Sequence, residues 1–319
     1  MKVLFVCSGN KDAKPGTVVK NQAESLKASG IDIGYFLIKG KGFKGYLRNV
    51  WILKKYLKNK KWDLIHSHYS LSAFVATMAL YISSNSPHVV SLMGSDAKLM
   101  NWSKLLVIFC HQVFWNNTIV KSKRMLKDLK IKDATIIPNG VEISKIRNFE
   151  NNQKISSNNK EADKTKKTIL FAANPANKVK NFQLAEASVQ MTDAFLKVIY
   201  NKSHEEVLKE ILEADILLLT SHWEGSPNII KEAMACNCPI VSTNVGDVEW
   251  LFGDEPGHYI TSFHPEDVAV KIQSALKYAE YQGKTNGRER LIQLGLDSDT
   301  VAKKIIQVYK EVINNRKES

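Results

Sequence analysis

Residues 215–249 read DILLLTSHWEGSPNIIKEAMACNCPIVSTNVGDVE, and this stretch decides the fold. Its apolar run at 216–219 predicts a buried parallel strand, and a second buried strand is predicted at 239–242. Between them, Ser226 is predicted as the N-cap and Pro227 as the first residue of a helix. A helix N-terminus with its partial positive charge then lies at the carboxyl end of a parallel strand, a place that binds phosphate.

Two glutamates flank the predicted helix start. Glu224 lies in the loop before the helix, and Glu232 lies in its second turn. Two carboxylates beside an anion site suit a ligand that carries hydroxyl groups around a phosphate, as a sugar nucleotide does. The plainer interpretation is an ordinary strand–loop–helix–strand unit with two solvated glutamates.

The run EGSPNIIKEAMACNCPIVST at 224–243 resembles the E-x7-E motif of retaining GT-B glycosyltransferases, most closely those of glycosyltransferase family 4. The resemblance implies that Glu224 binds hydroxyls of the donor sugar and Glu232 the ribose hydroxyls. It also implies contacts of the loop and helix start with sugar and phosphate, through Gly225, Ser226, Pro227, Asn228 and Ile229. Gly246 and Asp247 resemble the family's Gly-Gly-x-x-Glu loop, whose plainer interpretation is a turn.

A second segment, FAANPANKVKNF at 171–182, resembles the family loop in which an Arg and a Lys hold the donor pyrophosphate. Lys180 matches the Lys, Pro175 stands where the Arg is expected, and Lys178 is the candidate for the second charge. Two cations near a diphosphate stabilise the leaving group as the glycosidic bond breaks. The alternative is a pair of exposed loop lysines.

Four positions in the first half are weaker candidates. Gly9 and Gly16 suit a loop whose backbone approaches a ligand closely. His68 ends the stretch DLIHSH, which resembles the family's D-V-I-H-x-H strand end, and is a candidate for the acceptor site or a structural histidine. The family's donor-contacting His is replaced here by Met93, which leaves Asp96 as a polar candidate for donor binding.

The chain has 319 residues, of which 44% are hydrophobic and 24% charged, as in soluble globular proteins with two domains. No apolar stretch is long enough to span a membrane, and the N-terminus predicts a strand rather than a signal peptide. Four scattered cysteines indicate reduced thiols and a cytoplasmic protein. No metal site and no nucleic-acid recognition motif is found.

The positive charge is concentrated in the first half. Residues 1–150 carry 24 Lys+Arg against 9 Asp+Glu, and residues 39–61 carry nine bases and no acid. Apolar residues recur among these bases at helical spacing, which predicts a helix with one apolar side. One interpretation is a helix that lies on an anionic membrane surface, with Lys54, Lys55 and Lys58 toward the lipid. The other is a helix that packs on its own domain.

Strand–helix alternation predicts an α/β fold with doubly wound parallel sheets. The resemblance implies the GT-B fold, in which two Rossmann-like domains face a cleft. The expected parts are an acceptor-binding domain at 1–146, a polar linker at 147–167, a nucleotide-sugar-binding domain at 168–298, and a terminal helix at 299–319 that returns to the first domain. The stretch after Lys180 is shorter than in the family, so we expect a small second domain.

The resemblance implies a retaining hexosyltransferase that moves a sugar from a nucleoside diphosphate, UDP, to a hydroxyl of a glycan or lipid-linked sugar in cell-surface polysaccharide synthesis. It implies no metal and no other cofactor, and catalytic roles for Glu224, Lys180 and His68. The absence of the usual His and Arg leaves a second hypothesis: a catalytically weak sugar-nucleotide-binding subunit that assists a partner transferase. An epimerase of similar fold is disfavoured by the family 4 pattern.

Overall fold

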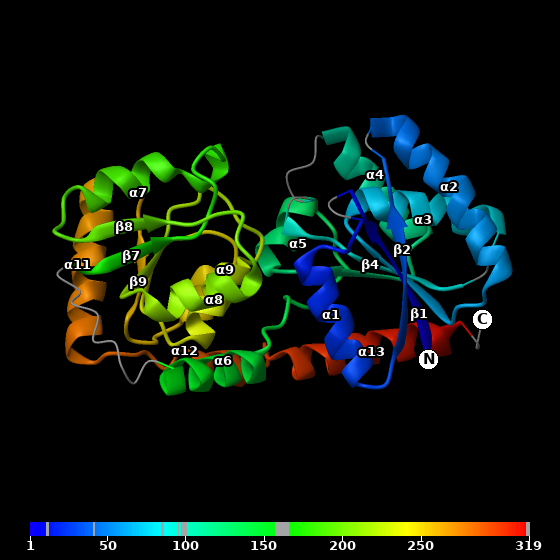
Figure 1. The fold of residues 1–319 in the computed structure, drawn as a ribbon. Helices are drawn as coiled ribbons and strands as arrows, with labels where there is room; N and C mark the ends of the chain where they lie inside the picture. Colours follow the sequence, from blue (N-terminus) through cyan, green and yellow to red (C-terminus); the bar gives the residue numbers. More distant parts are fainter. Residues whose placement is uncertain are drawn as a thin grey trace. The chain divides into compact units, whose positions relative to one another are not determined.

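The structure of the chain is a computed structural model that describes residues 1–10, 13–40, 42–83, 86–94, 96, 101–156 and 166–316. The chain divides into two compact units (Figure 1). Unit 1 comprises Met1–Gly140 together with Ser298–Ser319, and unit 2 comprises Val141–Asp297. The C-terminal segment therefore belongs to the same unit as the N-terminal half.

Unit 1 is built on six parallel strands. They are β1 Lys2–Ser8, β2 Asp32–Ile38, β3 Leu64–His68, β4 His88–Ser91, β5 Asn117–Val120 and β6 Thr135–Ile136, in the order β2-β1-β3-β4-β5-β6. The helices are α1 Thr17–Ala28, α2 Gly42–Asn59, α3 Ser70–Ser83, α4 Asn101–Val113, α5 Lys123–Leu129 and the terminal α13 Ser298–Asn315. Helices connect consecutive strands, as parallel pairing requires.

Two cores cover the two faces of this sheet, because alternate residues of a strand face opposite sides. Val3 and Phe5 of β1 pack with α1 and with α13, which buries Tyr309 completely. Leu4 and Val6 pack with α2 and α3 on the other face. Figure 1 shows α1 and α13 together on one side of the sheet and α2 and α3 on the other.

Unit 2 has five parallel strands in the order β11-β10-β9-β7-β8. They are β7 Thr168–Phe171, β8 Phe195–Val198, β9 Ile216–Leu219, β10 Ile240–Thr243 and β11 His258–Thr261. The helices are α6 Ile143–Ser156, α7 Phe182–Val189, α8 His204–Glu213, α9 Asn228–Ala235, α10 Val248–Phe252, α11 Pro265–Tyr281 and α12 Gly287–Gln293, with a short 3-10 helix, η2, at Lys178–Lys180.

The prediction of two doubly wound, Rossmann-like α/β units is confirmed. The predicted linker is wrong over 147–156, which lies in α6, and 157–165 lies outside the described residues. Burial of Ile146 and an ion pair between Glu150 and Arg288 stabilise this polar helix. Unit 2 is nearly as long as unit 1, because α6, β11 and α12 add to the elements expected, so the domain is not small.

None of the helices in the part of the chain that the structure describes combines the length and the apolar character that a membrane-spanning helix requires.

Candidate active site

Three loops of unit 2 meet at the carboxyl edge of its sheet. They follow β7, β9 and β10, and they contain 172–181, 220–227 and 244–247. These strands are neighbours in the sheet, so their carboxyl ends lie side by side. In open α/β sheets this edge is where ligands bind. The predicted site residues of the second half all lie in these loops or in α9, which follows the second loop.

Lys180 and Glu224 connect the first two loops directly. The Lys180 ammonium Nζ lies 2.5 Å from Glu224 Oε1, and the Ser221 hydroxyl donates to the same oxygen at 2.9 Å. The Thr220 hydroxyl donates to the main-chain carbonyl of Lys180 at 3.1 Å. The Lys180 and Glu224 side chains are 26% and 16% exposed, whereas Lys178 is exposed. The structure therefore brings Lys180, and not Lys178, against the predicted sugar-binding carboxylate.

The start of α9 differs from the prediction. Pro227 is the N-cap, with φ −69° and ψ 116°, and no side chain caps the helix. Ser226 is not the N-cap, because its hydroxyl accepts a hydrogen bond from Lys231 Nζ at 3.2 Å. A helix N-terminus without a side-chain cap keeps its dipole available for an anion.

Lys231 is a residue of this site that the sequence analysis missed. Its side chain is fully buried in α9, where burial lowers the pKa of its ammonium to about 8, while Asp247 and Glu232 act to raise it. Burial raises the pKa of the Asp247 carboxyl, and Lys231 and Ser226 act to lower it. The sequence gives one sign of this buried charge, a lysine inside the apolar run NIIKEAMA. The carboxylate that interacts with it, Asp247, lies in another loop, so the sequence does not connect the two.

Gly246 holds the third loop against the second. Its φ is +62°, and a Cβ at this position would lie 2.8 Å from the Gly225 carbonyl oxygen and 3.1 Å from that of Glu224. Only glycine adopts this conformation and allows this approach without strain. Gly246 and Asp247, which resemble the family's donor-site loop, thus lie in a loop whose backbone contacts the backbone of Glu224 closely.

Glu232 is oriented by His204, which the sequence analysis also missed. His204 Nε2 lies 3.0 Å from Glu232 Oε1, and both side chains are about four-fifths buried. The hydrogen bond to Glu232 raises the pKa of the His204 imidazole, against the opposing effect of burial. His204 is the first residue of α8, next to the capping residue Ser203.

We expect this pair to stabilise unit 2 in a pH-dependent way. A raised imidazole pKa in the folded state means that the contribution is fully present below about pH 6.5 and is lost as the pH rises through the folded pKa. The substitution His204→Gln should therefore cost about 1 kcal/mol at pH 6 and much less at pH 8.5. Urea unfolding at both pH values measures this cost. His264→Gln, at an exposed histidine, is the control, and an equal cost of His204→Gln at both pH values would contradict the prediction.

His68 of unit 1 is buried rather than open to a ligand. Its Nε2 lies 2.8 Å from Gln22 Oε1, and its ring lies 4.3 Å from the ring of His66 on the same side of β3. Burial lowers the pKa of the His68 imidazole to about 3. His66 Nδ1 lies 2.6 Å from the Tyr309 hydroxyl, which connects β3 to the terminal helix. This arrangement is that of structural histidines.

Asp96 is also buried, and it joins two segments of unit 1. One carboxylate oxygen accepts from the Ser70 amide at 3.1 Å and the Ser70 hydroxyl at 2.7 Å, and the other accepts from the Met93 amide at 2.7 Å. Burial raises the pKa of this carboxyl, and the three hydrogen bonds act to lower it. The predicted donor contact does not fit a carboxylate that is 4% exposed and used in this way.

The two loop glycines of unit 1 differ. A Cβ at Gly9 would lie 2.7 Å from Leu37 Cβ, so Gly9 is required by packing on β2 and not by a ligand. Among the described residues, a Cβ at Gly16 would meet no atom within 4 Å. Open space at Gly16, the N-cap of α1, is compatible with the predicted approach of a ligand, which stays a prediction.

The basic helix α2 packs on its own domain. Val50, Leu53 and Leu57 are buried against the sheet, which is the alternative that the sequence left open. Lys55 and Lys58 are exposed, and Lys54 is half-buried with its ammonium 5.0 Å from the Trp51 ring centre. These buried residues are therefore not available to a membrane, whereas the basic side of the helix and Leu47, Trp51 and Ile52 are exposed.

Family models match both units. The model described as "Glycosyltransferase Family 4" matches residues 2–145, and the model described as "Glycosyl transferases group 1" matches residues 190–293. Together they cover most of unit 1 and the region of unit 2 that holds Glu224 and Glu232. The chain belongs to glycosyltransferase family 4. It is thus a transferase of the glycosyl-transferring class.

Curated relatives of this family 4 protein are distant. The putative teichuronic acid biosynthesis glycosyltransferase TuaC of Bacillus subtilis is 23% identical over 69% of the chain, and the chain spans 62% of the length of TuaC. The uncharacterized glycosyltransferase MJ1178 of Methanocaldococcus jannaschii is 25% identical, over 78% of the chain and 77% of the relative.

Solved structures share the GT-B fold of this family 4 protein. A sucrose-phosphate synthase from Thermosynechococcus elongatus superposes with a TM-score of 0.79 at 15% identity, covering 99% of this chain and 100% of that chain. HepE of Anabaena, in complex with UDP-glucose, superposes with a TM-score of 0.74 at 14% identity, covering 98% and 100%. The fold assignment is therefore confirmed.

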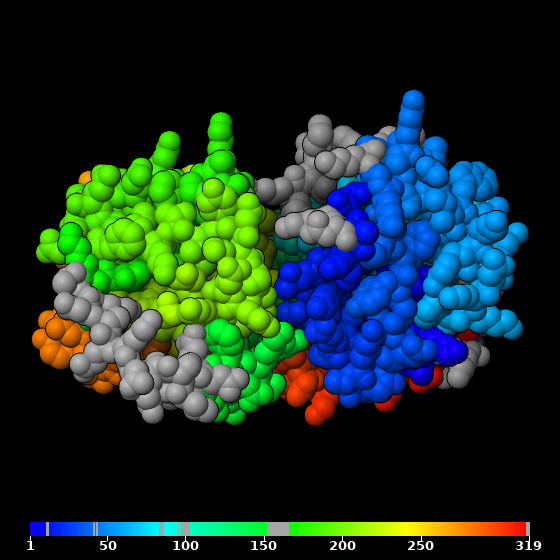
Figure 2. Space-filling view, in the orientation of Figure 1, coloured from blue at the N-terminus to red at the C-terminus, as the bar shows by residue number. Residues whose placement is uncertain are grey.

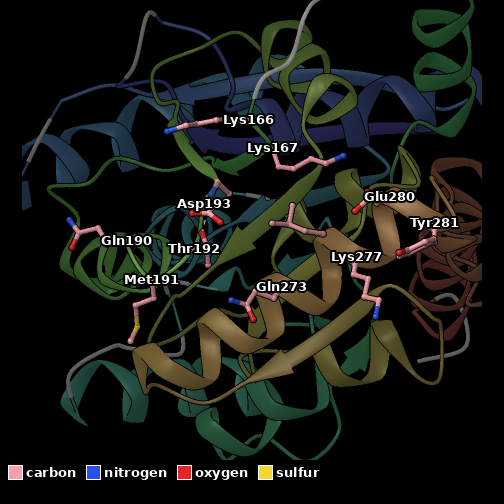
Figure 3. A pocket seen from close by; sticks show the side chains of 12 residues that line it. Lys166, Lys167, Gln190, Met191, Thr192, Asp193, Gln273, Lys277, Glu280 and Tyr281 are labelled. Atoms are coloured by element: carbon pink, nitrogen blue, oxygen red, sulfur yellow. Dashed lines mark hydrogen bonds between the residues drawn. The ribbon is translucent and has the colours of Figure 1, made fainter.

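A pocket of about 720 Å³ lies at the amino edge of the unit 2 sheet, opposite the carboxyl edge that holds the candidate site (Figure 3). Its lining includes Lys167 before β7, Asp193 before β8 and Tyr281 at the end of α11. Lys167 and Asp193 precede β7 and β8, whereas the predicted donor residues follow the strands. The pocket of Figure 3 is therefore separate from the candidate active site of this glycosyltransferase.

Within the described residues, no three His, Cys, Asp or Glu side chains are grouped to hold a metal ion.

Proposed function

We propose that the chain transfers a sugar from a nucleoside diphosphate sugar, with UDP as the nucleotide, to a hydroxyl of a sugar acceptor, with retention of configuration and without a metal. The observation that carries the proposal is the contact between Lys180 Nζ and Glu224 at the uncapped start of α9. A diphosphate attracts the ammonium, and the carboxylate then accepts hydrogen bonds from sugar hydroxyls.

Each proposed role follows from the charge and position of its residue. Lys180 neutralises charge on the leaving diphosphate, and the exposed Lys178 adds a second positive charge that water and salt screen strongly, so its effect is weaker. The amides of residues 225–229 meet the sugar and the phosphate at the helix N-terminus. Glu232, held by His204, accepts hydrogen bonds from the ribose hydroxyls. The leaving phosphate accepts the proton of the acceptor hydroxyl in a front-face reaction, which requires no nucleophilic side chain. UDP-glucose bound to HepE supports the choice of donor class.

The acceptor that we propose is a glycan or lipid-linked sugar, at the cytoplasmic face of the cell membrane. The name of TuaC, which refers to teichuronic acid biosynthesis, supports an acceptor in cell-surface polysaccharide synthesis. The basic segment 39–61 with Lys54, Lys55 and Lys58 supports peripheral attachment to anionic lipid.

Thermal stabilisation by a panel of nucleotide sugars tests the donor proposal. A ligand at 100 times its Kd stabilises the folded state by about 2.7 kcal/mol, so the correct donor should raise the Tm more than sugar nucleotides with another base or another sugar at the same concentration. No shift with any nucleoside diphosphate sugar at millimolar concentration would argue against the donor site.

The substitution Glu232→Ala should weaken UDP binding roughly ten- to hundredfold, because it removes charge-assisted hydrogen bonds to the ribose. Isothermal titration of UDP measures the change. Glu186→Ala, at an exposed glutamate of α7, is the matched control and should bind UDP like the wild type. Unchanged UDP affinity in Glu232→Ala would remove Glu232 from the proposed site.

A second function, a sugar-nucleotide-binding subunit without turnover, is favoured by one observation. Met93, which stands where the family has its donor-contacting His, is 4% exposed and packs in the core of unit 1. Slow hydrolysis of the donor by the purified protein separates the two functions. A transferase releases UDP above background, and a turnover-dead binder releases none although the same donor raises its Tm.

A further inference from the structure

Helix α3 presents an apolar stripe to solvent. Leu71, Met78 and Tyr81 are 52%, 48% and 80% exposed, and their spacing of seven and three residues places them on one side of the helix. The helix contains no charged residue, and its opposite side is buried against the sheet. A helix that is apolar all round is normally covered on every side, so the exposed stripe indicates a missing partner.

Helix α4 continues this apolar surface. Leu105, Phe109 and Val113 are 67%, 53% and 57% exposed and recur at intervals of four residues. The Phe114 ring lies 5.7 Å from that of Phe109 and 6.0 Å from that of Tyr81, so it joins the two helices. We call Leu71, Met78, Tyr81, Leu105, Phe109 and Val113 the apolar ridge.

Helix α2 borders the ridge with a basic stripe, because α2 and α3 pack side by side on the same face of the sheet (Figure 1). Lys44, Arg48, Trp51, Lys55 and Lys58 are exposed and follow one another at intervals of three or four residues. In Figure 2 the light-blue side chains of this part of the chain lie on the outer surface of unit 1. Tryptophan between bases is typical of side chains at the boundary of lipid and water.

Acidic residues are nearly absent from this part of the chain. Residues 33–127 contain only Asp63 and Asp96. Asp63 accepts a hydrogen bond from the Lys2 amide, and Asp96 is buried. A second copy of the chain would face this surface with the same positive charge, whereas an anionic bilayer is complementary to it.

We propose that the apolar ridge and the basic stripe together form a membrane-docking surface for an anionic lipid bilayer. The ridge enters the boundary between headgroups and acyl chains, and the lysines of α2 bind lipid phosphates. The inference rests on the membrane attachment proposed above but changes its source of affinity. Most of the apolar side chains come from α3 and α4, since Val50, Leu53 and Leu57 of α2 are buried in its own domain.

Flotation of the full chain with vesicles, without any sugar nucleotide, tests this surface. Binding to vesicles of phosphatidylglycerol and phosphatidylcholine should exceed binding to phosphatidylcholine alone at least about tenfold. The double variants Lys55→Glu/Lys58→Glu and Phe109→Ser/Val113→Ser should each lower binding to the mixed vesicles about tenfold or more. Lys303→Glu/Lys310→Glu, on α13, and Val270→Ser, 56% exposed on α11, are the matched controls and should bind like the wild type.

Equal binding of the ridge variant and the wild type would overturn the inference, as would equal binding of the wild type to both kinds of vesicle. The inference would also be overturned if the wild type binds no vesicles and forms a dimer in sedimentation velocity that Phe109→Ser/Val113→Ser dissociates. That result would assign the ridge to self-association. The Tm response to nucleotide sugars is measured on the same samples. A retained response with no vesicle binding refutes the docking surface alone and leaves the donor site standing.

Discussion

Replacing Lys180 by Met is expected to lower the rate of donor turnover by about 10²–10³-fold. The ammonium lies 2.5 Å from Glu224 at the start of α9, where charge develops on the leaving diphosphate in the proposed reaction. Methionine keeps most of the volume and removes the charge. The effect belongs to the transition state, in which the leaving group is most negative, so kcat should fall more than the affinity for UDP.

The neighbouring lysine provides the matched control. Lys178 lies in the same 3-10 helix, two residues earlier, but its side chain is exposed. Lys178→Met should therefore change donor turnover by no more than a few-fold. Donor hydrolysis or transfer, followed by release of UDP, measures both variants. Equal losses in the two variants would show that the loop acts through its overall charge and not through the Lys180–Glu224 contact.

The sequence predicted the parallel sheets and the helix between β9 and β10 because these depend on local patterns. Strands covered on both faces are continuous apolar runs such as Ile216–Leu219. The family resemblance assigned both Lys180 and Glu224 to donor binding. Their contact across 44 positions follows from the parallel sheet, which places the carboxyl ends of β7 and β9 at one edge.

The sequence did not predict the features that depend on distant partners. Ser226 is a good N-cap by residue type, but Lys231 occupies its hydroxyl. Helix α6 has a polar composition and is held by an ion pair of Glu150 with Arg288. His68 and Asp96 carry chemistry that suits a site, and only the structure shows that each is buried and hydrogen-bonded to its own unit.

The substitution Lys231→Met is expected to lower the free energy of unfolding by about 3–5 kcal/mol, the largest stability effect that we predict. The ammonium and the Asp247 carboxylate are both buried, and removal of one charge leaves the other without compensation in a medium of low dielectric constant. Lys209→Met, at an exposed lysine of α8, is the control and should cost less than about 0.5 kcal/mol. Urea unfolding measures both changes.

A double-mutant cycle separates loss of the charge pair from loss of packing. Asp247→Asn removes the uncompensated charge, so Lys231→Met/Asp247→Asn should be more stable than Lys231→Met alone by about 2 kcal/mol or more. Additive effects within about 0.5 kcal/mol would show that the two charges do not interact. Lys231 also donates a hydrogen bond to Ser226, which fixes the loop after Glu224. The double variant lacks this hydrogen bond, so it should recover stability without recovering full affinity for the donor.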